Sequence, residues 1–117
     1  METGKQVLEK ANAAITEGDY KGFLSYCTED TVWNFIGEQV LNGKQAVRKY
    51  MAEVYVEPPK FRVESLVAEG EFVIAVGKIR LKNKEGEYAD YDYCDVWRLR
   101  NVKLRELKAF VVEESFA

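Results

Sequence analysis

Acids and aromatic residues alternate in the stretch Asp90–Trp97, with the sequence DYDYCDVW. In a strand, successive side chains point to opposite faces, so Asp90 and Asp92 would share one face. Asp95 would lie on the other face, together with Tyr91, Tyr93 and Trp97. A carboxyl group among aromatic rings either anchors the structure through hydrogen bonds or takes part in binding and proton transfer. Asp95 is therefore the first candidate for a functional residue.

Histidine is absent from the sequence, and the two cysteines, Cys27 and Cys94, have no paired spacing. The sequence therefore excludes Ser-His-Asp and Cys-His nucleophiles, histidine-bound zinc and imidazole general bases. No metal site and no cofactor is predicted, and acid-base chemistry would fall to Asp, Glu, Tyr, Lys or Cys. Two unpaired cysteines are typical of a reducing compartment, so a cytoplasmic protein is expected.

Length and composition indicate one domain over residues 1–117, because 117 residues with 47% hydrophobic content can bury a single core. The net charge of -3 argues against a nucleic-acid partner, since proteins that bind the phosphate backbone usually carry a basic excess. Charges are scattered through the N-terminal segment METGKQVLEKANAAITEG, which has no continuous apolar run. Neither a signal peptide nor a membrane span is expected there.

Helices are predicted in the first half of the chain and strands in the second. Thr3 and Asp19 are suitable N-caps for two helices, a short strand is expected at 31–36, and apolar residues at helical spacing predict a third helix at 46–54. In that helix the stripe of Tyr50, Met51, Val54 and Tyr55 is predicted to be mostly core. After this point the hydrophobic period changes to two, which predicts strands at about 61–69, 71–82, 87–100 and 103–113.

The turn NKEGE, Asn83–Glu87, suits a three-residue hairpin loop and sets the register of the strands on either side. Counting back from it places two basic residues opposite two acids: Lys78 opposite Asp92 and Arg80 opposite Asp90. These two acids are therefore explained by their partners.

The next hairpin leads to the same assignment for Asp95. A three-residue loop at 101–103 sets Asp95 opposite Ala109, on an apolar face. Helices followed by a strand meander predict an α+β fold, in which a curved, mostly antiparallel sheet forms a cone around the three helices and encloses a pocket.

Three stretches and the order of elements resemble the nuclear transport factor two-like superfamily, especially its ketosteroid-isomerase-like and SnoaL-like branches. The matching stretches are ITEGDYKGFLSYCTEDTVW, LNGKQAVRKYM, and CDVWRL followed by VKLRELKAF. The resemblance covers nearly the whole chain and implies the same cone-shaped fold.

The resemblance also implies a catalytic apparatus, from which this chain departs. The isomerases use a carboxylate base after the second helix, and an oxyanion hole made by a tyrosine on the first helix and a protonated aspartic acid on the sheet. Here Asn34 stands in place of the base and Ala11 in place of the tyrosine, and only Asp95 matches. An amide does not accept a proton at neutral pH and a methyl group does not donate a hydrogen bond. The acid of the SnoaL-type cyclases is likewise missing from KAFVVEES.

The predicted ligand-binding residues are Asn34, Tyr91, Tyr93, Asp95 and Trp97, with Asp95 as the candidate catalytic residue. Trp33 and Phe35, on the other side of the strand from Asn34, are predicted to be packing residues. Three functions stay open at this stage. The chain is a domain that binds a small apolar molecule, an isomerase, dehydratase or cyclase using Asp95 on a small apolar carbonyl compound, or a dimeric interaction module with an incidental cavity.

Apolar residues also gather on the predicted outer face of the sheet. We call this group the outer strip: Phe72, Ile74, Val76, Cys94, Val96, Phe110 and Val112. An apolar strip of this extent is too large to leave in water, so a homodimer through this face is expected. The resemblance implies the same, because superfamily members commonly pair through this face.

Overall fold

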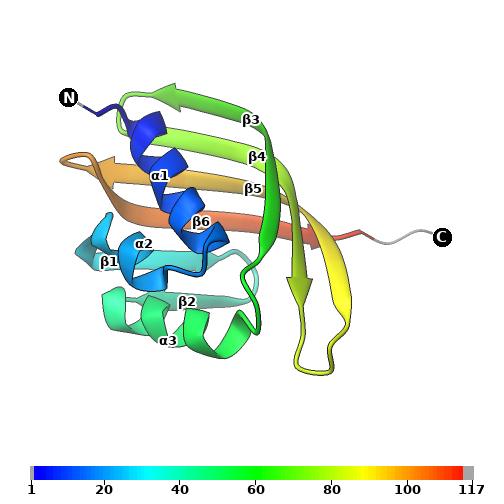
Figure 1. Cartoon of the computed structure of the whole chain (residues 1–117). Coiled ribbons are helices and arrows are strands. Elements are labelled where there is room, and N and C mark those ends of the chain that lie inside the picture. The colour runs from blue at the N-terminus through cyan, green and yellow to red at the C-terminus, as the bar shows by residue number, and fades with distance from the viewer. Residues whose placement is uncertain (1, 115–117) are drawn as a thin grey trace.

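A computed structural model of the chain describes residues 2–114 and contains three helices and one six-stranded sheet (Figure 1). The helices are α1 (Gly4–Thr16), α2 (Tyr20–Ser25) and α3 (Lys44–Val54). The strands are β1 (Cys27–Phe35), β2 (Gln39–Asn42), β3 (Lys60–Glu69), β4 (Phe72–Lys82), β5 (Tyr88–Arg100) and β6 (Lys103–Glu113). None of the three described helices is long and apolar enough to cross a membrane.

The sheet bends around the three helices, which all lie on its concave side (Figure 1). Its strand order is β2-β1-β6-β5-β4-β3, with β1 and β6 parallel and the other neighbouring strands antiparallel. This is the predicted α+β cone, and the predicted bounds of the four long strands agree with the observed ones to within one residue.

Local capping interactions begin the first two helices where the sequence predicted. The Thr3 side chain accepts a hydrogen bond from the Gln6 amide (3.2 Å), and the Gln6 side chain accepts one from the Thr3 amide (2.9 Å), which together form a capping box. Gly18 follows α1 with φ of 79°, and Asp19 then accepts a hydrogen bond from the Gly22 amide at 2.9 Å. The left-handed backbone at Gly18 turns the chain sharply into α2.

The core lies between the helices and the concave face of the sheet. Phe23 of α2 is fully buried and packs edge-on against Trp33 and Trp97, with ring centroids 5.7 and 6.5 Å apart. Leu8 of α1 and Leu104 of β6 are also fully buried. Removal of a side chain as large as Phe23 from such a core typically costs about 3–5 kcal/mol of folding free energy.

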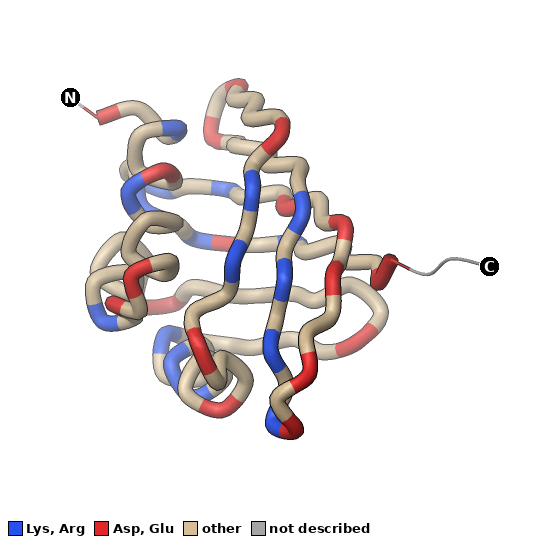
Figure 2. Tube along the Cα trace, turned by 45° about the vertical axis from the view of Figure 1, so that its right-hand side comes forward, with Lys and Arg blue, Asp and Glu red and all other residues tan. Residues whose placement is uncertain are grey.

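The predicted register of β4 and β5 is confirmed. Lys78 pairs with Asp92 and Arg80 with Asp90, and each pair is joined by a side-chain contact of 2.7 Å. Figure 2 shows the basic residues of β4 running beside the acidic residues of β5. Asp95 faces Ala75 on one side and Ala109 on the other, as counted from the two hairpins.

The turn between β5 and β6 is shorter than predicted. It contains only Asn101 and Val102, both with positive φ (52° and 58°), so Arg100 pairs with Lys103. A bulge then shifts the register between Arg98 and Leu99, which restores the predicted pairing of Arg98 with Glu106. The three-residue loop was therefore wrong, and the register beyond it was right, because the extra residue lies in β6 instead of in the turn.

Strand β1 begins at Cys27, four residues before the predicted start at residue 31. Its early part is held by β6, a partner distant in the chain. The Leu104 amide donates to the Tyr26 carbonyl at 2.9 Å, and the Thr31 hydroxyl donates to the Leu104 carbonyl at 3.0 Å. Local composition indicated a strand only from residue 31, and this long-range pairing extends it toward the N-terminus.

Candidate functional site

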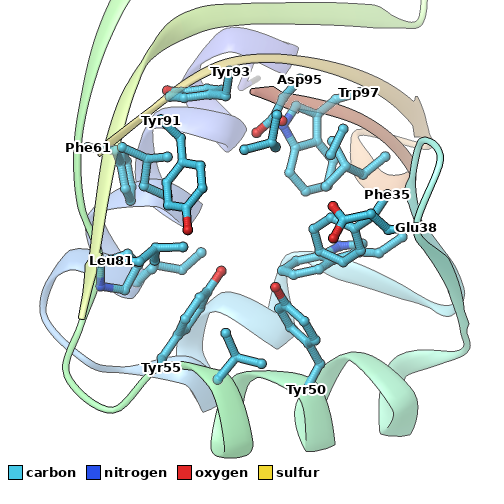
Figure 3. Close-up of a pocket in the computed structure, with 18 residues that line it drawn as sticks. Phe35, Glu38, Tyr50, Tyr55, Phe61, Leu81, Tyr91, Tyr93, Asp95 and Trp97 are labelled. Carbon is cyan, nitrogen blue, oxygen red and sulfur yellow. The ribbon is translucent and has the colours of Figure 1, made fainter. Parts of the chain in front are cut away.

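A cavity of about 300 Å³ lies between α3 and the concave face of the sheet (Figure 3). Its lining comes from α1, α3, the segment after α3, the turn between β1 and β2, and strands β1, β3, β4, β5 and β6. Eight of the lining residues are aromatic: Trp33, Phe35, Tyr50, Tyr55, Phe61, Tyr91, Tyr93 and Trp97. The two charged ones are Glu38 and Asp95.

Three small residues lie near Asp95, and only one of them borders the cavity. Ala109, opposite Asp95 on β6, lines the cavity, whereas Ala75, opposite it on β4, is buried in the core. Gly77 serves the approach of β3, because a Cβ atom there would overlap the backbone carbonyl of Arg62 next to the bulge in β3. Only Ala109 of these three leaves space for the cavity.

The Asp95 side chain points into the cavity from β5 (Figure 3). Within residues 2–114 no hydrogen bond or ion pair reaches its carboxyl group, and burial alone raises its pKa to about 7. A structural anchor would need a partner in the protein, and the described residues supply none. At neutral pH both the charged and the neutral form of the Asp95 carboxyl group are therefore accessible.

Tyrosine hydroxyl groups reach the cavity both from α3, across from Asp95, and from β5, the strand that carries Asp95. Figure 3 shows the hydroxyls of Tyr50 and Tyr55, from the end of α3, and of Tyr91, from β5, pointing inward. Burial raises the pKa of Tyr50 to about 12 and also raises the pKa of Tyr55 and of Tyr91. Burial, followed by the charge of Asp95, raises the pKa of Tyr93 to about 12. These phenols therefore stay protonated at neutral pH and act as hydrogen-bond donors.

The structure brings four of the five predicted ligand-binding residues together, because Tyr91, Tyr93, Asp95 and Trp97 all line the cavity. Asn34 does not line it. In β1 Asn34 pairs with Val40 and Lys108 and lies on the outer face, while its neighbours Trp33 and Phe35 point inward. Asn34 thus lies on the other face from the one predicted, because alternation defines two faces and the pairing with β6 decides which one is inside. Trp33 and Phe35 do pack with the core, as predicted, and they also line the cavity.

Several lining residues were not predicted. Tyr50 and Tyr55 belong to a stripe that helical spacing assigned to the core, and of that stripe only Met51 is fully buried. Trp33 contacts Phe35 and Tyr50 with ring centroids 6.0 Å apart in each case, so the aromatic wall continues from β1 to α3. The indole nitrogen of Trp33 is buried without a hydrogen-bond partner in the described chain. The sequence offered one indication of these lining residues, which is that Trp33, Phe35 and Tyr50 are aromatic, as many pocket residues are.

The structure also places the residue that stands in for the family's tyrosine. Ala11, in place of the tyrosine, is fully buried in α1 and is not a lining residue. In the described part of the chain, no group of three or more Cys, Asp or Glu side chains is placed to hold a metal ion. The chemistry available in the cavity is therefore that of two carboxyl groups, Asp95 and Glu38, and several phenols in apolar surroundings.

Comparisons with solved structures give the same fold. One similar structure is that of SalBIII, an epoxide hydrolase/cyclase-like enzyme with a role in pyran ring formation in the polyether salinomycin. It is 19% identical to this chain, with a TM-score of 0.85, and the match covers 92% of this chain and 89% of that one. A putative SnoaL-like polyketide cyclase from Shewanella putrefaciens is 20% identical, with a TM-score of 0.79 over 96% and 91%. An NTF2-like protein of unknown function from Burkholderia pseudomallei is 18% identical, with a TM-score of 0.81 over 93% and 90%.

Sequence comparison assigns the family. No curated protein matches the chain at a significant level. The sequence model of the SnoaL-like domain, by contrast, matches residues 8–107, which contain both β1 and the whole of β5. The chain therefore belongs to the SnoaL-like domain family, with the nuclear transport factor two-like fold.

Proposed function

We propose that the chain binds a small, largely apolar molecule in this cavity, and that the Asp95 carboxyl group is the polar contact that orients it. The observation that carries this proposal is a carboxyl group without a protein partner in the described chain, in a cavity lined mostly by apolar and aromatic side chains. Burial of such a group costs folding free energy, and groups of this kind are concentrated at functional sites. At ordinary packing density the cavity holds a molecule of roughly a dozen non-hydrogen atoms.

Binding of 4-phenyl-2-butanone, an apolar ketone of suitable size, tests this proposal. Both tryptophans of the chain line the cavity, so their fluorescence reports occupancy. Protonated Asp95 donates a hydrogen bond to the ketone and ionised Asp95 does not, so binding should be several times tighter at pH 5.5 than at pH 8.5. Asp95→Ala should weaken binding at pH 5.5 by roughly three- to tenfold and remove the pH dependence.

The control for this titration is Asp92→Ala, since Asp92 pairs with Lys78 on the outer face of the same strand. This variant should bind the ketone as the wild type does. A wild-type protein whose fluorescence does not respond to the ketone at either pH would overturn the binding proposal.

Proton transfer on a bound carbonyl compound is the second candidate function, in a reaction of the isomerase, dehydratase or cyclase type. It is supported by the pKa of Asp95 of about 7, because a group present in both forms at neutral pH can take up a proton and return it. Two structurally similar proteins are named as cyclases or cyclase-like enzymes, one of them acting in polyether assembly. Asp95 would take the place of the missing family base.

Hydrogen–deuterium exchange in the same ketone tests proton transfer. In D₂O, ionised Asp95 would remove a proton from the carbon next to the carbonyl, leaving an enolate, and the carboxyl group would return a deuteron from solvent. NMR should detect exchange at least about tenfold faster than in buffer, rising with pH through about 7. Asp95→Asn should exchange at the buffer rate. Equal exchange with wild type and Asp95→Asn would leave binding as the function of the cavity.

We also propose that the chain forms a homodimer through the outer strip. The third candidate function, a dimeric interaction module, would use the same contact. Support comes from exposure: Phe72, Phe110 and Val112 of the strip are 44%, 42% and 67% exposed. Neighbouring strands bring the strip together, since Ile74 pairs with Val96 and Cys94 with Phe110. A stable dimer buries about 800 Å² on each partner, so the proposed contact would cover a large part of this sheet face.

Phe110→Glu should convert the proposed dimer into a monomer, because it places a charge in the middle of the apolar contact. Sedimentation velocity at micromolar concentration measures the result. Val56→Glu is the matched control, since Val56 is 51% exposed in the loop after α3 and is not part of the outer strip, and this variant should sediment as the wild type does. A monomeric wild type would contradict the proposal.

A cytoplasmic location is proposed on separate grounds. Cys27 and Cys94 are both free thiols, with Cys27 buried and Cys94 partly exposed on the sheet. Free thiols persist most readily in a reducing compartment.

A further inference from the structure

The cavity has an uneven distribution of charge. Glu38 and Asp95 line it, and no lysine or arginine is found among the lining residues that the structure describes. Asp95 is enclosed, whereas Glu38 is exposed and so lies where the cavity opens to solvent. An exposed glutamate carries a negative charge at neutral pH.

A tight turn between β1 and β2 positions Glu38. The Glu38 amide donates to the Phe35 carbonyl at 2.9 Å, and Gly37 has a φ of 82°, a conformation that glycine adopts without strain. The turn therefore brings Glu38 back beside Phe35, and Figure 3 shows the Glu38 carboxylate facing the cavity there.

No lysine or arginine within residues 2–114 forms an ion pair with Glu38, although acids elsewhere do have partners, such as Glu29 with Lys44 and Asp90 with Arg80. The charge of Glu38 affects two lining tyrosines, one from α3 and one from β5. Its charge adds to burial in raising the pKa of Tyr50 and, together with Glu113, adds to burial in raising the pKa of Tyr91. The opening thus carries a negative charge that forms no ion pair within residues 2–114.

Aromatic rings surround the same opening. The ring centroids of Phe35 and Tyr50 are 5.0 Å apart, and those of Tyr50 and Tyr55 are 6.0 Å apart. The faces of aromatic rings attract cations, and a carboxylate beside them adds to the attraction. Anions meet two carboxyl groups and no basic side chain in the described lining.

We propose that the cavity selects a ligand with a positively charged amine on an apolar body, and that the ammonium group lies between Glu38 and the rings of Phe35 and Tyr50. The apolar body then extends inward toward Trp97 and Asp95. This inference rests on the proposed binding function and adds the charge class of the ligand to it.

Three probes with the same apolar body test the selection: 4-phenylbutylamine, 4-phenylbutanol and 4-phenylbutyrate, titrated calorimetrically at pH 7. The amine should bind roughly three- to tenfold more tightly than the alcohol, and the carboxylate more weakly than either. Because Glu38 is exposed, the preference for the amine should also fall as sodium chloride is raised from about 20 to 500 mM.

Glu38→Gln removes the charge and keeps the shape of the side chain. The affinity for the amine should then fall to within about twofold of that for the alcohol, while alcohol binding is unchanged. Glu85→Gln is the matched control, because Glu85 is an exposed turn glutamate outside the cavity lining, and this variant should keep the preference.

The outcomes separate the two proposals. If none of the probes binds, the proposed binding function fails and this inference falls with it. If the alcohol binds and the amine is no tighter, the binding function stands and the charge selection is overturned. If Asp95→Asn removes the preference and Glu38→Gln does not, the assignment to Glu38 is overturned.

Discussion

Replacement of Asp95 by asparagine is expected to make the protein more stable at pH 8 and to leave its stability at pH 4 nearly unchanged. The folded protein holds the Asp95 proton up to a pKa of about 7, whereas an aspartate in the unfolded chain loses it near its ordinary value of 3.8. Between these values the folded state binds the additional proton, so the free energy of unfolding decreases as pH rises. Asparagine has no proton to lose, and its shape matches that of the neutral acid.

The size of this effect follows from the difference between the two pKa values. At about 1.4 kcal/mol for each unit of pKa, and with allowance for solvent in the cavity, the gain at pH 8 is on the order of 2–4 kcal/mol. Urea denaturation of wild type and variant at pH 4, 6 and 8 measures the difference as a function of pH. This experiment needs no ligand, so it examines the electrostatics of Asp95 separately from function.

Asp90→Asn is the control, because it changes an acid of the same strand that has a basic partner and a lowered pKa, whereas Asp95 is buried and has a raised pKa. A hydrogen bond from Arg80 lowers the pKa of Asp90, so its charged form stabilises the fold. This variant should lose stability at pH 8, and the loss should shrink as pH falls toward the lowered pKa of Asp90. A decrease in the stability of Asp95→Asn at pH 8 would mean that the Asp95 carboxylate supports the fold, contrary to its lack of described partners.

Filling the cavity with Ala109→Leu is expected to abolish ligand binding while the protein stays folded. Ala109 faces Asp95 on one side and Phe35 on the other, and its side chain borders the cavity. A leucine there extends into space that would otherwise hold the ligand. Affinity for 4-phenyl-2-butanone should fall by about thirtyfold or more, because the loss includes both contact area and access to Asp95.

Ala75→Leu is the matched comparison, since Ala75 faces Asp95 from β4 and is buried like Ala109, but it is not a lining residue of the cavity. The same added volume overpacks the core and should cost about 1–3 kcal/mol of stability. Ala109→Leu should unfold at the wild-type temperature or above it, as measured by circular dichroism. Normal ketone binding by Ala109→Leu would show that the ligand binds elsewhere.

The pairing of β4 with β5 was predictable because it depends on residues close together in the chain. A hairpin turn sets the register, and the strand period of two then carries it outward to Lys78, Asp92 and Asp95. The turn at Asn101 and Val102 marks the limit of such counting. Its length was wrong, and a bulge in β6 compensated for it, because the sequence near a turn does not determine where an extra residue is placed.

The placement of β1 was not predictable by the same method. Alternation separated Trp33 and Phe35 from Asn34, but both faces of this strand carry residues that suit an interior or a pocket. Pairing with β6 turns Trp33 and Phe35 inward. It depends on contacts such as that of Thr31 with Leu104, which are 73 residues apart in the chain. A preference of this kind depends on packing, which a local pattern does not contain.

The sequence by itself determined the fold class and the grouping of Tyr91, Tyr93, Asp95 and Trp97 on one face of one strand. Both follow from short-range periodicity. Only the tertiary structure decided which side chains complete the cavity around that face, since Trp33, Tyr50 and Glu38 come from elements that meet β5 only after folding. The physical reason is that a cavity is enclosed by elements far apart in the chain, and their contacts depend on how helices pack on the curved sheet.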